Sequence, residues 1–167
     1  MRFIVLLSLV SAFILVNVPN VLAQKKKTKT VKASPCRGLK QGITGTVIFK
    51  SGNYMPSVDN QNSPATNLGV TREIFVYQLT NQSQVQQDPE DMTFFTNPKT
   101  KLVAKTKSKK NGCFTIRLAE GKYSVFVKEK GKFYANSFDG EGNIFPVSVK
   151  EGNATNIVFE INCGAVY

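Results

Sequence analysis

Apolar and polar residues alternate along several short segments of the chain after residue 41. Alternation with a period of two is typical of half-buried β-strands. It occurs in residues 42–49, 72–80, 101–108, 113–118, 123–129 and 153–162. Residues 130–149 add a strand, a Gly-rich loop and a further strand, and no helical period follows the first 23 residues. About seven short strands with turn signals between them predict an all-β fold, an antiparallel Greek-key β-sandwich.

The apolar positions of these segments predict the core between the two sheets. They are Ile43, Val47, Val76, Phe114, Ile116, Leu118, Tyr123, Val125, Phe159 and Ile161. Asn111-Gly112 lies between two predicted strands and supplies the positive φ of a tight hairpin. Gly121 marks the next turn.

The pattern Asn111-Gly112-x-Phe114-x-Ile116-x-Leu118-x-x-Gly121-x-Tyr123-x-Val125 resembles the hairpin signature of carboxypeptidase regulatory-like domains. The segment "GITGTVIF" (residues 42–49) is similar to the first strand of that group. The resemblance covers roughly residues 42–162 and implies a transthyretin-like (prealbumin-like) sandwich. The segment "FYANSFDGEGNIFPVSV" is similar to small exported bacterial proteins of this type without an assigned activity. Two polar insertions depart from the compact form of the family.

The first 23 residues have the pattern of a secretory signal peptide, and we expect cleavage after Ala23. Residues 24–41 form a basic tail, in which residues 24–40 carry seven Lys or Arg and no acid. The basic composition of this tail indicates either a tether to anionic surfaces or, the interpretation that we prefer, a solvated linker. Residues 42–167 form the predicted domain. We expect a periplasmic or secreted protein with no transmembrane anchor after cleavage and no nucleic-acid partner.

Three cysteines and no histidine constrain the chemistry. In an oxidising compartment one disulfide and one free thiol are expected, and a Cys36–Cys163 pair would join the two ends of the domain. The chain lacks the His ligands of the zinc carboxypeptidases that carry this kind of domain, and a His-based triad is impossible. We therefore predict that the protein is not an enzyme.

Asp139, Glu141 and Asn143 stand at alternate positions, as in the opening of a calcium loop. Lys150 stands where such a loop needs its final Glu. A turn between strands is the simpler interpretation. No cofactor is expected, and calcium is the weaker alternative.

The polar insertions, residues 51–70 and 81–100, carry Tyr54, Met55, Phe94 and Phe95. Long loops are often functional, so these side chains could bind a peptide or a sugar. Alternatively, the insertions fold back over the sandwich.

Taken together, these features predict a non-catalytic binding or structural module of the bacterial cell envelope. It would engage a protein partner through its long loops or through a sheet edge. The alternatives are a module that binds carbohydrate or anionic surfaces through the tail and loop aromatics, and a calcium-dependent adhesion-type domain.

Overall fold

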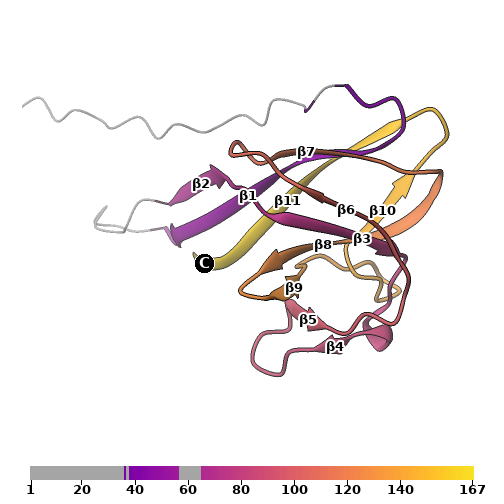
Figure 1. The fold of residues 1–167 in the computed structure, drawn as a ribbon. Helices are drawn as coiled ribbons and strands as arrows, with labels where there is room; N and C mark the ends of the chain where they lie inside the picture. The colour runs from indigo at the N-terminus through magenta and orange to yellow at the C-terminus, as the bar shows by residue number, and fades with distance from the viewer. Residues whose placement is uncertain (1–35, 37, 57–64) are drawn as a thin grey trace, which may run out of the picture.

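The computed structural model describes residues 36, 38–56 and 65–167, which form two packed β-sheets (Figure 1). The predicted signal peptide and most of the basic tail lie outside the described residues. The elements are β1 (Gly42–Asn53), β2 (Thr66–Gly69), β3 (Glu73–Gln78), η1 (Gln82–Gln84), β4 (Gln86–Gln87), β5 (Phe94–Thr96), β6 (Leu102–Lys107), β7 (Cys113–Arg117), β8 (Gly121–Glu129), β9 (Lys132–Tyr134), β10 (Pro146–Val149) and β11 (Ala154–Val166). The prediction of an all-β sandwich is confirmed.

Sheet A is built around β1. One edge of β1 pairs in parallel with β11, and its other edge pairs antiparallel with β7 and then with β2. The two ends of the domain therefore lie side by side in one sheet, as the long indigo and yellow strands of Figure 1 show. Every other strand pair in the described ranges is antiparallel, so the sandwich is mostly antiparallel, as predicted.

Sheet B has the order β4-β5-β9-β8-β3-β6, and β10 also pairs with β8. The insertion 81–100, predicted as a loop, contributes β4 and β5 to this sheet and η1 beside it. In the described ranges no helix is long and apolar enough to cross a bilayer.

The core lies between the inner faces of the two sheets. All ten residues predicted for it are buried, and Ile43, Val47 and Val76 are fully so. Period-two alternation identified them because a strand buries every second side chain.

The Asn111-Gly112 turn forms, but it does not join two paired strands. The amide of Gly112 donates to the Lys109 carbonyl (2.8 Å), and Gly112 has φ +82°. The strand before the turn, β6, belongs to sheet B, whereas β7 belongs to sheet A. The turn after β7 likewise leads from sheet A to sheet B, where β8 lies. The predicted hairpin is therefore a crossing between the two sheets. A Cβ at Gly112 would lie 2.2 Å from the Val47 carbonyl oxygen, which adds a packing reason for Gly there.

The disulfide joins Cys36 to Cys113, with Cα atoms 5.7 Å apart. The predicted Cys36–Cys163 pair is therefore wrong. Cys113 pairs with Thr46 across β1 and β7, on the face of sheet A turned away from the core. The chain at Cys36 crosses this same face, where the Thr44 hydroxyl donates to the Cys36 carbonyl (2.6 Å). Cys163 packs against the core instead and is a free thiol.

A candidate binding groove beside the free edge of β11

Within the part of the chain that the structure describes, β11 pairs with one strand only, β1. Near its start the Thr155 hydroxyl donates to the Ser148 carbonyl (2.7 Å). Further along, the Asn162 amide donates to the Tyr134 hydroxyl (3.2 Å). Between these two contacts, the outer edge of β11 has no strand partner among the described residues.

A hollow of about 380 Å³ lies beside this edge, between β11 and the segment that links β9 to β10. Val158 and Glu160 line it from β11, and Asn136, Ser137 and Phe145 line it from the linking segment. Val158 is 44% exposed. The hollow and the strand edge together form what we term the β11 groove.

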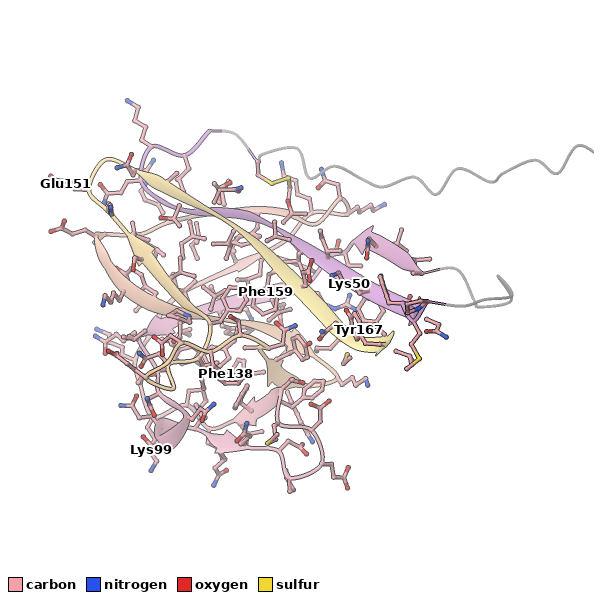
Figure 2. The ribbon with its side chains drawn as sticks, turned by 180° about the vertical axis from the view of Figure 1, so that it is seen from behind. Lys50, Lys99, Phe138, Glu151, Phe159 and Tyr167 are labelled. Atoms are coloured by element: carbon pink, nitrogen blue, oxygen red, sulfur yellow. A yellow bond between two sulfur atoms is a disulfide. The ribbon has the colours of Figure 1, made fainter. Side chains whose placement is uncertain are left out.

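Phe145 adopts an unusual backbone conformation for a bulky residue. Its φ is +38°, although Pro146 follows it and disfavours conformations other than extended ones in the residue before it. Its amide donates to the Ser137 carbonyl (2.7 Å), and its carbonyl accepts from the Val125 amide (3.3 Å). These bonds hold the ring against Phe159, with ring centroids 4.4 Å apart, so that an aromatic side chain borders the groove. Figure 2 labels Phe159 midway along β11.

A bulge in β11 places a polar cluster beside the groove. Phe49 pairs with Ile161 but Ser51 pairs with Gly164, so β11 contains one extra residue there. Such an insertion redirects side chains, and Asn162 accepts hydrogen bonds from the Tyr134 hydroxyl and from Asn136 Nδ2. Burial raises the pKa of Tyr134 to about 12. The phenol therefore stays protonated, and this cluster carries no charge at neutral pH.

Charge along β11 is low. Glu160 is its one acidic or basic side chain, and Lys50 Nζ lies 2.6 Å from its carboxylate. The hydrogen bond to Glu160 raises the pKa of Lys50, in spite of the opposing effect of burial. Figure 2 shows Lys50 and Tyr167 near the end of this strand.

The Cys163 thiol adjoins the bulge. Burial is the main cause that raises its pKa, so little thiolate forms at neutral pH. The thiolate is the reactive form of cysteine, which makes this residue a poor nucleophile.

The predicted loop residues separate into two pairs. Met55 is 50% exposed, and Tyr54 stacks on Tyr167 with ring centroids 5.3 Å apart. The Tyr54 hydroxyl donates to the Thr66 carbonyl (2.9 Å) and to Asn67 Oδ1 (2.6 Å), which ties the end of β1 to β2. Tyr54 is half-buried and Met55 is exposed, and a role of either in ligand binding stays a prediction.

Phe94 and Phe95 are 5% and 0% exposed, so for this insertion the alternative holds in which it folds back onto the sandwich. They form part of β5, and pairing with β9 fixes them between other aromatic rings. Phe94 reaches the surface only at a hollow of about 210 Å³. Two of the three carboxylates at that hollow are engaged, since Asp88 forms an ion pair with Lys132 and Asp91 accepts from Thr93.

Asp139, Glu141 and Asn143 lie together in a turn that hydrogen bonds to itself. Asp139 Oδ1 accepts from the Glu141 and Asn143 amides (3.0 and 2.8 Å), and Asn143 Nδ2 donates to both carboxylates. Hydrogen bonds from Asn143 are the main cause that lowers the pKa of Asp139. The turn thus uses the Asp139 oxygens internally, and no group of three or more Cys, Asp or Glu in the described ranges has the arrangement of a metal site.

No protein-family model, curated protein or solved structure matched the chain. The resemblance to carboxypeptidase regulatory-like domains therefore stays a prediction, and the function has to be argued from the geometry.

Sequence reasoning missed the β11 groove. It foresaw that a sheet edge could bind a partner, but it could not identify the edge. The sequence does contain a signal for this edge. Residues 154–166 include a single charged residue and no Pro, whereas β6 carries Lys105 and Lys107. Lys and Pro are devices that keep exposed edges from pairing.

Proposed function

We propose that the protein is an exported, non-catalytic binding module that engages an extended segment of a partner protein along the β11 groove. The observation that carries this proposal is the unpaired edge of β11 with an aromatic-bordered hollow beside it. Backbone groups of a free edge can pair with an added strand, while a neighbouring hollow accepts alternate side chains of that strand.

Three features support a peptide occupant. The edge lacks the lysines and prolines that normally prevent pairing. Asn136 and Ser137 offer hydrogen-bonding groups at the rim, opposite Val158. The strained Phe145 backbone is held in place by the fold, and such strain is concentrated at binding and active sites.

The test uses a peptide selected from a random library displayed on phage against the immobilised chain. We expect Val158→Lys to lower the affinity for that peptide by about tenfold or more, because the substitution places a charge at the groove. Leu102→Lys is the matched control. Leu102 is similarly exposed (43%) but lies on β6, a free edge of sheet B, so this variant should bind the peptide as the wild type does.

Amide hydrogen exchange locates the bound peptide. Strand addition should protect amides of β11 and leave β6 unchanged. Failure to select any peptide, equal affinity in Val158→Lys, or a loss confined to Leu102→Lys would each refute the proposal. Concentration-dependent dimerisation that Val158→Lys abolishes would identify a second copy of the chain as the occupant and would overturn the assignment to another protein.

Export rests on the N-terminal pattern and is supported by the Cys36–Cys113 disulfide, because disulfides persist in oxidising compartments. We expect the mature protein to begin at Gln24, and N-terminal sequencing of the protein made with its full N-terminus checks this. A mature chain that begins at Met1 would refute cleavage at this position.

A further inference from the structure

The outer face of sheet B, turned away from sheet A, carries aromatic side chains across three neighbouring strands. Phe75 on β3 pairs with Phe126 on β8, and Lys128 on β8 pairs with Phe133 on β9, so all four share one face. The Phe75 and Phe133 rings meet edge to face at 5.0 Å, and Tyr77 meets Phe133 at 5.7 Å. Phe126 is fully buried beneath them, whereas Phe75 and Phe133 are half-buried.

Lysines lie over the exposed sides of these rings. Lys105 Nζ is 4.6 Å from the centroid of Phe75, and Lys128 Nζ is 4.5 Å from the centroid of Phe133. An ammonium group is attracted to the negative face of an aromatic ring. Positive charge therefore lies beside the faces of both half-buried rings. We call Phe75, Tyr77, Phe133, Lys105, Lys107 and Lys128 the basic aromatic face.

Positive charge exceeds negative charge on this face. Glu73 lies across from Lys107 in the register of β3 and β6, and its carboxylate is 2.8 Å from Lys105 Nζ. The hydrogen bond from Lys105, helped by the charges of Lys107 and Lys128, lowers the pKa of Glu73. One carboxylate against three lysines leaves this surface positive at neutral pH.

The Tyr77 side chain adds a polar group without a protein partner. Its ring packs against Phe126 and Phe133, the residue is 8% exposed, and no hydrogen bond of its hydroxyl is found within the described ranges. No buried polar side-chain atom there lacks a partner, so this hydroxyl is open to solvent. Leu102 lies opposite it on β6 and is 43% exposed. A ligand on this face would therefore meet an apolar surface, a hydroxyl and several ammonium groups.

Protection of a sheet edge does not account for these lysines. Lysines on an edge strand keep it from pairing with other chains, and Lys105 and Lys107 on β6 fit that role. Lys128 does not, because β8 lies inside sheet B between β3 and β9. Its position over an aromatic ring on an internal strand requires another reason.

We infer that the basic aromatic face binds an anionic sugar polymer. The lysines would pair with its carboxylates or sulfates. As they turn from the rings towards these anions, they would leave the negative ring faces to the C–H groups of the sugar. A nucleic acid also combines flat rings with anions, but the Cys36–Cys113 disulfide places the protein where nucleic acid is uncommon. This site is separate from the β11 groove, so an experiment can refute either proposal without affecting the other.

The probe is polygalacturonate, with neutral dextran as its uncharged counterpart. We expect the chain to bind polygalacturonate and not dextran, with affinity that falls as salt is raised. Lys105→Gln/Lys128→Gln should reduce this affinity about tenfold, because it removes two charge contacts at the surface. Lys40→Gln/Lys150→Gln removes the same charge from exposed positions elsewhere and is the matched control. Phe133→Leu keeps the charge, and it should also weaken binding.

Amide NMR shifts on addition of polygalacturonate distinguish this face from the basic tail. Shifts on β3, β6, β8 and β9 are expected. The inference fails if shifts are confined to the tail, if both double variants weaken binding equally, or if dextran binds as well. Tighter binding to single-stranded DNA or to phosphatidylglycerol vesicles than to polygalacturonate would overturn the assignment to a sugar polymer.

Discussion

Replacement of both disulfide cysteines, Cys36→Ser/Cys113→Ser, is expected to lower the free energy of unfolding by about 4 kcal/mol. The bond joins residues separated by 77 positions, and without it the unfolded chain gains the conformational entropy of that loop. A loss of this size is a large part of the stability of an ordinary domain. Urea unfolding followed by circular dichroism measures it.

Cys163→Ala is the control for this prediction. Cys163 is a half-buried free thiol, and we expect its replacement to change the free energy of unfolding by about 1 kcal/mol or less. Peptide mapping without reduction should recover a fragment that joins Cys36 to Cys113. A mapped Cys36–Cys163 fragment, or a larger loss in Cys163→Ala than in the double variant, would contradict the observed pairing.

Phe95→Ala is expected to destabilise the protein by about 4 kcal/mol, within the range of buried Phe truncations. Phe95 is fully buried, and its ring lies 6.0 Å from Phe126 and 6.2 Å from Phe138 between ring centroids. Its loss would leave a cavity between the insertion and the outer face of sheet B. Urea unfolding again provides the measurement.

Met92→Ala is the control for this prediction, because it truncates a surface side chain in the same insertion. Met92 is 70% exposed, so its truncation should change the free energy of unfolding by about 0.5 kcal/mol or less. Equal small effects of the two substitutions would mean that Phe95 does not contribute to the core. That result would restore the interpretation of the insertion as a ligand-binding loop.

Local patterns in the sequence were enough to find most of the longer strands and about half of the core. Residues 42–49 and 113–118 have clear period-two alternation, and β1 and β7 form there. Alternation reports which side of a strand is buried, and this depends only on neighbouring residues. The short strands β4 and β5 were missed because two or three residues in a polar insertion carry no such period.

The pattern could not specify the sheet that each strand joins. Asn111-Gly112 indicated a turn, and a turn forms, but the packing of the whole chain sends β6 to sheet B and β7 to sheet A. The same packing brings Cys113 to Cys36, because both lie on the outer face of sheet A.

The sequence by itself determined an all-β sandwich and ten of the 21 buried apolar core residues that the structure describes, since both follow from period-two burial along single strands. Only the tertiary structure decided the disulfide, the free edge of β11 and the basic aromatic face. Each of these joins residues that are far apart in the chain, such as Phe75 and Phe133. Contacts of that kind depend on strand order and register, which arise from the packing of all the strands together.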